Sequence, residues 1–163
     1  MNLLEHTTTW VNGEVLQGKI MLGLGILLLG ATIAIFKSEH ELLKGSLIPL
    51  GLLTLMLCGY GGFQVFGRPP HIQKVSEVFA QNPETAVKQE LEKAQKDDRI
   101  YSTVKVVWII LLAIAAIGSL FISADFYKGL TIGLMVMFLS MLIIDTTLHH
   151  RLQVYMNALN QLQ

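Results

Sequence analysis

The side chains best suited to chemistry in this 163-residue sequence stand at the ends of two long apolar stretches. Asp145 lies near the end of the last stretch, His149 follows it by one helical turn, and His71 comes just after the second stretch. An acid inside a membrane span is costly and therefore a functional candidate. Because carboxylate and imidazole groups can bind zinc or carry a proton, we expect Asp145, His149 and His71 to form a candidate proton or metal cluster.

The same acid has a plainer alternative role at the membrane surface. Asp145 could pair with Arg68, Arg151 or His149 and so anchor the end of its span. The sequence has no His-x-x-His, Glu-x-x-His or Cys-x-x-Cys spacing, which weakens the metal hypothesis. It also has no complete phosphate-binding Gly-x-x-x-x-Gly-Lys-Ser/Thr loop and no Gly-x-Ser-x-Gly nucleophile, which favours a protein without enzymatic activity.

Four apolar runs must position these side chains, and they cover most of the chain. They fall at about 18–36, 45–66, 103–123 and 126–148. A helix rises ~1.5 Å per residue, so roughly 20 apolar residues cross a hydrocarbon core ~30 Å thick. Composition agrees, since 52% of the residues are hydrophobic and only 15% are charged. The sequence therefore predicts an all-α integral membrane four-helix bundle, built from two transmembrane hairpins in a single membrane domain over 1–163.

The distribution of Lys and Arg predicts which side of the membrane each segment faces. With four spans, both termini and the segment between spans two and three share one side, and the two short turns share the other. Of twelve basic residues, the turns carry only Lys37, Lys44 and Lys128. Because cytoplasmic segments are enriched in Lys and Arg, we expect both termini on the cytoplasmic side of an inner or plasma membrane. The first run is longer than the apolar region of a usual signal peptide, about 7–15 residues, and is expected to remain as a span.

The segment 69–102, between the second and third spans, is predicted to be a cytoplasmic helical hairpin. Apolar residues at helical spacing predict its first helix. Asn82 followed by Pro83 is typical of the cap and first turn of a second helix. Because neither Gly nor Pro interrupts residues 84–117, we expect this helix to continue into the third span. The hairpin either ties the two pairs of spans together or offers 70–101 as a docking surface for a cytosolic protein partner.

Both ends of the chain are also predicted to be amphipathic helices. Apolar residues recur at three- and four-residue steps from Leu148 to Leu162, so the fourth span is expected to continue as a helix beyond the membrane. At the other end, Thr7 to Thr9 offer capping hydroxyls before Trp10, whose indole ring suits the lipid headgroup layer. Packing against the hairpin, or against another copy of the chain, is expected for both.

Small residues spaced four apart predict where helices approach closely, because lipid provides no hydrophobic drive between them. Such pairs in the spans include Gly129 with Gly133, Gly30 with Ala34, and Cys58 with Gly62. They indicate either packing within the bundle or self-association into a homo-oligomer.

The two pairs of spans suggest the hypothesis of an internal repeat, although ordinary membrane composition would produce similar matches. An offset of 84 residues, 128 minus 44, places Lys44-Gly45 on Lys128-Gly129. Both pairs of spans would then begin and end on the same side, as in a parallel duplication.

Three classes of function are compatible with these features. The first is an oligomeric scaffold or accessory subunit in the bilayer. The second is a small homo-oligomeric channel or transporter lined by Asp145, Ser119, Ser123 and Thr54. The third is a metal-binding membrane protein or enzyme that uses Asp145 and His149. No cofactor is expected, because the spans contain no histidine to hold haem, and a net charge of zero gives no attraction for nucleic acid.

Overall fold

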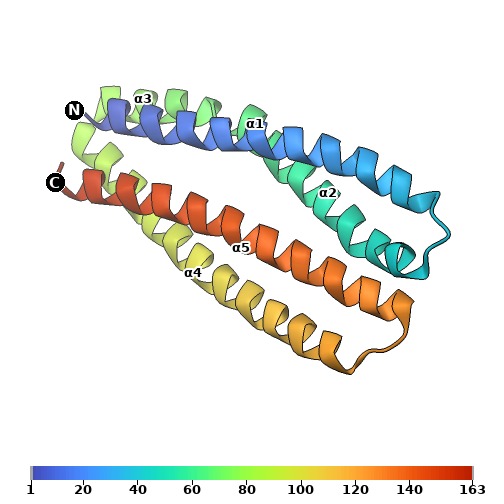
Figure 1. Ribbon diagram of the computed structural model, residues 1–163. Helices are drawn as coiled ribbons and strands as arrows, with labels where there is room; N and C mark the ends of the chain where they lie inside the picture. Colours follow the sequence, from blue (N-terminus) through green and yellow to red (C-terminus); the bar gives the residue numbers. More distant parts are fainter. Residues whose placement is uncertain (1, 163) are drawn as a thin grey trace.

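The chain folds into five α-helices, four of them long (Figure 1). The computed structural model describes residues 2–162. The helices are α1 (Leu3–Phe36), α2 (Glu41–Gly67), α3 (Pro70–Gln81), α4 (Pro83–Phe121) and α5 (Asp125–Asn160). Four helical segments, beginning with α1, α2, α4 and α5, are long and apolar enough to cross a membrane. The predictions of an all-α four-helix bundle and of four candidate membrane-spanning helices are therefore confirmed.

The long helices lie in the order α1, α2, α5, α4 (Figure 1). Extensive contacts join α1 to α2, α2 to α5 and α5 to α4, while α1 shares a smaller contact with α5. Consequently α2 and α5 are the inner helices, and α1 and α4 are the outer ones. Both termini lie at one end of the molecule, where α3 packs on α1 and α4. We call this the terminal end, and we call the end with the two connections 37–40 and 122–124 the turn end.

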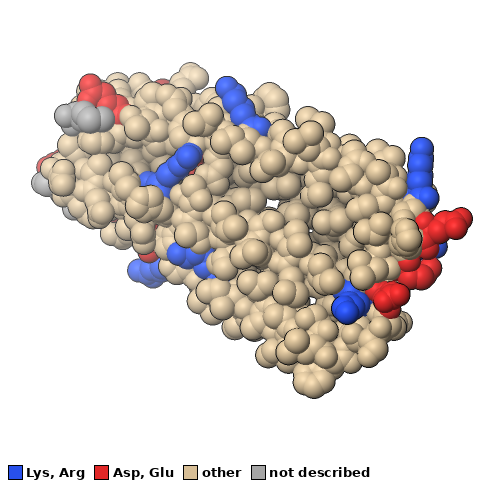
Figure 2. All heavy atoms as spheres, in the orientation of Figure 1, with Lys and Arg blue, Asp and Glu red and all other residues tan. Residues whose placement is uncertain are grey.

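On the face shown in Figure 2, charged side chains lie on the terminal half of the molecule and at the turn end, and an uncharged zone separates the two groups. Many large apolar side chains in that zone are exposed, including Leu27 on α1 and Leu120 on α4, at 72% and 80%. In water such a surface would be unfavourable, whereas lipid chains can cover it. This exposure pattern agrees with the four candidate membrane-spanning helices.

The first turn of α1 is capped by Asn2. Its side-chain oxygen accepts the backbone N–H of Glu5 at 3.0 Å, and the Glu5 carboxylate accepts the backbone N–H of Asn2 at 3.0 Å. This reciprocal pair is a capping box. The prediction that Thr7 to Thr9 cap this helix is wrong, because Asn2 and Glu5 already satisfy the first amides and the threonines lie within the helix. The Thr7 hydroxyl instead bonds the carbonyl of Leu3 and lies 2.7 Å from the Tyr155 hydroxyl.

The junction between α3 and α4 forms as the sequence predicts. Asn82 is extended, and its side chain accepts the backbone N–H of Thr85 at 3.0 Å. Pro83 occupies the first turn of α4, where its missing amide hydrogen costs nothing. The helix then runs without interruption to Phe121, so the predicted continuous helix into the third span is confirmed.

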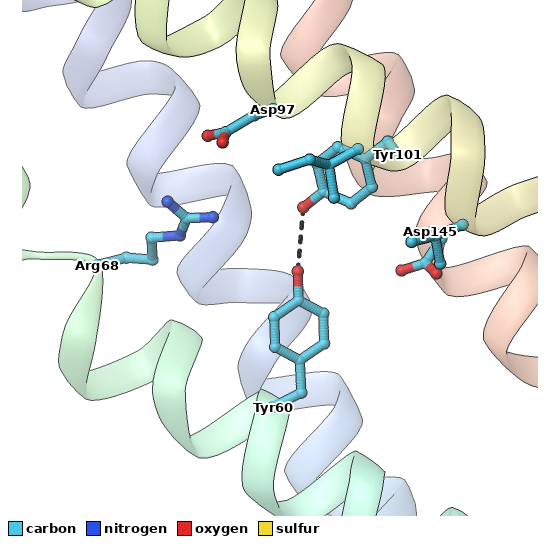
Figure 3. Close-up of a pocket in the computed structure, with 7 residues that line it drawn as sticks. Tyr60, Arg68, Asp97, Tyr101 and Asp145 are labelled. Atoms are coloured by element: carbon cyan, nitrogen blue, oxygen red, sulfur yellow. Dashed lines mark hydrogen bonds between the residues drawn. The ribbon is translucent and has the colours of Figure 1, made fainter.

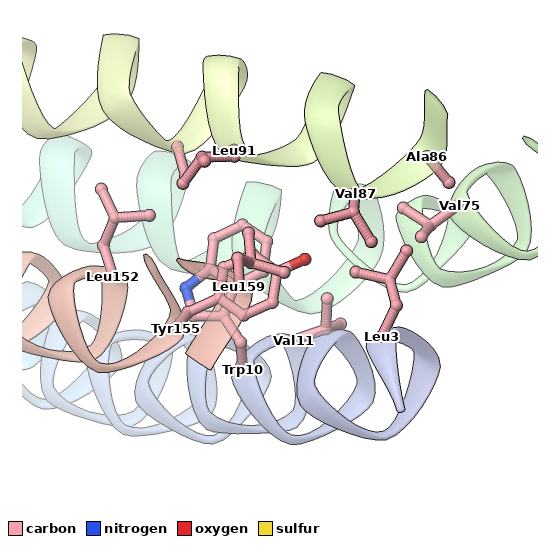
Figure 4. Close-up of a cluster of buried hydrophobic side chains, with 11 residues drawn as sticks. Leu3, Trp10, Val11, Val75, Ala86, Val87, Leu91, Leu152, Tyr155 and Leu159 are labelled. Carbon is pink, nitrogen blue, oxygen red and sulfur yellow. The ribbon is translucent and has the colours of Figure 1, made fainter. Parts of the chain in front are cut away.

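A hydrophobic core at the terminal end unites four helices (Figure 4). Its buried members come from α1, α3, α4 and α5: Leu3, Trp10, Val11, Val75, Ala86, Val87, Leu91, Ala94, Leu152, Tyr155 and Leu159. Because α3 and the first part of α4 contribute to this core, the segment between the second and third spans is packed onto both ends of the chain. This cluster is called the terminal core below.

Glycines allow backbones to meet at two places. At the turn end, a Cβ added to Gly45 would lie 2.8 Å from the Phe126 carbonyl carbon, and one added to Gly129 would lie 2.7 Å from that of Leu42. At the contact between α1 and α2, a Cβ on Gly18 would lie 2.8 Å from the Gly61 carbonyl oxygen. Carbon atoms in contact are normally ~3.5 Å or more apart, so no side chain fits at these positions.

Candidate functional site

A cavity of about 270 Å³ lies between the two pairs of long helices, toward the terminal end (Figure 3). Three of its lining groups are charged, namely Arg68 at the end of α2, Asp97 on α4 and Asp145 on α5. The hydroxyl oxygens of Tyr60 and Tyr101 meet 3.0 Å apart at its wall. This cavity, which we call the inter-hairpin cavity, combines acids, a cation and hydroxyl groups beside an apolar core.

Arg68 is already paired within the protein. Its Nε lies 3.0 Å from Oε2 of Glu14 on α1, and the two side chains are only 15% and 1% exposed. The guanidinium also lies over the rings of Trp10 and Phe63, at 5.1 and 5.7 Å from their centres. Such contacts stabilise a cation that is partly removed from water. Once Glu14 neutralises Arg68, the remaining lining charges of the cavity are the carboxylates of Asp97 and Asp145.

Asp145 is held by an indole ring and not by any of the bases proposed for it. The Nε1–H of Trp108 on α4 donates to Asp145 Oδ2 at 2.6 Å. Asp145 is 5% exposed, so this bond replaces water for one carboxylate oxygen. The Trp108 ring in turn stacks on Phe138, with ring centres 6.0 Å apart. Helices α4 and α5 therefore position Asp145 through a hydrogen bond and an aromatic contact.

His149 lies one turn beyond Asp145 but faces a different partner. Its Nε2 is 2.6 Å from Oδ1 of Asp98 on α4. The imidazole ring stacks on Tyr101 at 5.8 Å, and the Gln153 amide nitrogen lies 3.3 Å from the same Nε2. The contact between α4 and α5 thus contains a buried imidazole paired with a partly exposed carboxylate, next to the inter-hairpin cavity.

His71 belongs to a third group, beside the terminal core, where its ring lies against Trp10. Its Nε2 is 2.9 Å from Oε2 of Glu90, and the Lys93 ammonium lies 3.2 Å from the same nitrogen. The Tyr155 hydroxyl donates to Glu90 at 3.1 Å. Burial opposes ionisation of Glu90, but His71, Lys93 and the Tyr155 hydroxyl outweigh it and lower the pKa of this carboxyl. Burial lowers the pKa of Lys93.

The structure therefore distributes the three predicted residues among three partners: Asp145 to Trp108, His149 to Asp98, and His71 to Glu90. Among residues 2–162, no group of three or more His, Cys, Asp or Glu side chains is placed so as to hold a metal ion. The arrangement instead provides separate hydrogen-bonded pairs along the terminal half of the bundle.

The predicted pore-lining hydroxyls do not gather at this cavity. Thr54 bonds the Leu50 carbonyl in its own helix, and Ser119 bonds that of Ala116. Ser123 is exposed in the connection between α4 and α5. Of the four side chains expected to line a path, only Asp145 lines the inter-hairpin cavity.

The three small-residue pairs lie in different surroundings. Gly129 and Gly133 lie on the contact between α5 and α2, where a Cβ on Gly133 would meet Ser46 at 3.3 Å. Cys58 lies against Gly25 of α1, since a Cβ there would approach its Sγ to 2.7 Å, whereas Gly62 has open space around it. Gly30 also has open space and Ala34 is exposed.

An incomplete phosphate-binding motif lies inside a helix. Gly13, Gly18 and Lys19 have the spacing of a phosphate-binding loop, although Ile20 stands where that motif needs Ser or Thr. All four residues lie inside α1. Their backbone amides are therefore used in the helix and do not form a phosphate cradle.

Comparison of the chain with protein families, with curated proteins and with solved structures finds no match in any of the three. The functional assignment therefore depends on the residues and their geometry. The sequence analysis did not identify Trp108, Tyr60 and Tyr101 as site residues. The signal that could have indicated them is that these aromatic residues lie toward the ends of apolar runs.

Proposed function

We propose that this chain is a membrane scaffold or accessory subunit without enzymatic activity, which self-associates through its outer helix α1. The observation that carries the proposal is the uneven burial of the four spans. Within the most apolar stretch of each helix, only 11% of α1 and 6% of α4 is buried, against 39% of α5. Neighbouring helices therefore cover much of the apolar surface of the inner helices, whereas most of the apolar surface of the outer helices is exposed.

Small residues on the free face of α1 favour a second protein helix over lipid alone. Gly30 has nothing within 4 Å of an added Cβ, and Ala34 lies one turn further on the same face. Pairs of this kind allow two backbones to approach closely, and the resulting dispersion contacts drive association in lipid. A second copy of the chain offers an identical surface and can pair about a two-fold axis.

The terminal end supplies the part of the scaffold that leaves the bilayer. The terminal core joins α3 and the start of α4 to both chain ends, so it forms one packed unit. The excess of Lys and Arg on this side supports a cytoplasmic location, with residues 70–101 as the surface for a cytosolic protein. A reporter fused after Gln163 that behaved as extracytoplasmic would contradict this orientation.

The test of self-association is the mass of the detergent-solubilised protein, measured by light scattering. We expect wild type to be a dimer or larger, and Ala34→Leu to shift the protein toward monomer because the added side chain blocks close approach. Ala113→Leu is the matched control, since Ala113 is exposed on the other outer helix. A monomeric wild type, or equal effects of both substitutions, would count against the proposal.

The inter-hairpin cavity supports a second candidate function, a small channel or transporter. Its two carboxylates beside a span could take up a cation or a proton. Ion flux into liposomes that carry wild-type protein but not Asp145→Asn would favour this function. Absence of flux with a stable oligomer would favour the scaffold.

A further inference from the structure

A second cavity, of about 390 Å³, lies between α1 and α5 at the terminal end. Its polar lining comes from His6 and Thr9 on α1 and from His150 and Arg151 on α5. Arg is always charged, and the other three side chains can each donate a hydrogen bond. Within residues 2–162, no acid contributes to this lining. The cavity, which we call the basic groove, therefore suits an anion.

Trp10 provides an independent observation that points to a ligand. Its side chain also lines the basic groove, and it stacks on Tyr155 with ring centres 4.9 Å apart (Figure 4). Trp10 is 7% exposed, and its indole N–H has no hydrogen-bond partner among the described residues. A buried donor without an acceptor is unfavourable, and a ligand oxygen that reached this N–H would satisfy it.

The depth of the groove relative to the spans indicates where such a ligand would come from. Gly13 precedes the start of the first apolar run by five residues, and Arg151 follows the end of the fourth by three. At ~1.5 Å per residue, these two residues lie roughly 5–8 Å outside the hydrocarbon core, and the other residues that line the groove, apart from His150, lie farther out. The headgroup layer on each side of a bilayer is about as thick. Apolar side chains of Val154 and Ala158 complete the wall.

We propose that the basic groove binds the phosphate group of an anionic phospholipid. Arg151 supplies the fixed charge, and the histidines, Thr9 and the Trp10 indole N–H supply donors for the phosphate oxygens. A phospholipid is favoured over free phosphate because Arg151, which carries the fixed charge of the groove, lies at headgroup depth. Neither α1 nor α5 alone has a basic face, which is why the sequence pattern did not indicate this site.

The test is lipid retention after reconstitution into equal parts of phosphatidylglycerol and phosphatidylcholine, followed by native mass spectrometry. We expect wild type to retain phosphatidylglycerol with roughly tenfold preference, and Arg151→Gln to reduce that preference by about tenfold, because a charge-assisted contact is lost. Arg99→Gln is the matched control, since Arg99 is exposed on α4 and does not line the groove.

Arg151 also donates to the Gly13 carbonyl, so its replacement could disturb folding. Ala158→Leu provides a second variant, which fills the groove while keeping every charge, and the same loss of preference is expected with an unchanged melting temperature. Equal retention of the two lipids by wild type, or no effect of either variant, would overturn the proposal. Binding of inorganic phosphate without any preference between lipids would assign the groove to free phosphate and refute the lipid.

Discussion

The close contact between the inner helices leads to a prediction about Gly129→Ala. The added Cβ would lie 2.7 Å from the Leu42 carbonyl carbon, against about 3.5 Å for carbon atoms in ordinary contact, so α2 and α5 must move apart by at least ~0.8 Å. Overpacking of this kind costs about 1–3 kcal/mol, and here the obstacle is backbone that no rotamer change can relieve. We expect a net loss of about 2 kcal/mol, which lowers the melting temperature by roughly 4–8 °C for a chain of this size.

The assay is thermal unfolding of detergent-solubilised protein, followed by the loss of the folded peak in size-exclusion chromatography. Gly51→Ala is the matched control, because it makes the same substitution in α2 at a position with nothing within 4 Å of the new Cβ. The control should keep or slightly raise the melting temperature, since Ala is a better helix former than Gly. If Gly129→Ala melted with the control, the inner helices would not be held by backbone contact at this point.

Further predictions concern the polar side chains at the terminal end. The lowered pKa of Glu90 means that its contribution to stability is present above the ordinary carboxyl pKa and is lost as pH falls through its folded pKa. The melting temperature of wild type should therefore exceed that of Glu90→Gln at pH 7, and the difference should vanish in acid; a difference independent of pH would refute this. Trp108→Phe removes the donor to Asp145 and should cost about 1–3 kcal/mol in the same thermal assay, whereas an unchanged melting temperature would show that the bond is dispensable. Tyr155→Phe deletes the hydroxyl that bonds Glu90 and should cost about 1 kcal/mol at pH 7, measured by the shift in melting temperature, and no shift would mean that water replaces it.

The helices could be predicted from the sequence because their signals are local. Each apolar run is long enough to define a span, and the absence of Gly and Pro from 84 to 117 is sufficient to predict one continuous helix there. The error at the first helix was also local. Asn2 followed by Glu5 is the pattern of a capping box, but the three threonines nearer Trp10 offered a competing signal.

The candidate site could be predicted only as a set of residues, because its pairings join distant segments. Asp145 was identified by the cost of an acid in an apolar run, yet its partner Trp108 lies 37 residues away on a neighbouring helix. The ion pair between Glu14 and Arg68 likewise joins α1 to the end of α2. Which base or donor reaches which acid depends on the rotation of each helix about its axis, and hydropathy does not determine that rotation.

The reciprocal glycine contacts at the turn end have a consequence for assembly. The offset of 84 residues that relates Gly45 to Gly129 also relates Leu42 to Phe126, and each glycine meets the backbone of the residue three before the other. This is the pattern of an isologous interface, in which the same patch meets itself. Here both patches belong to one chain, and residues 68–82 join the two hairpins. Covalent linkage makes their association intramolecular, so this contact forms at a fixed effective concentration, whatever the density of the protein in the membrane.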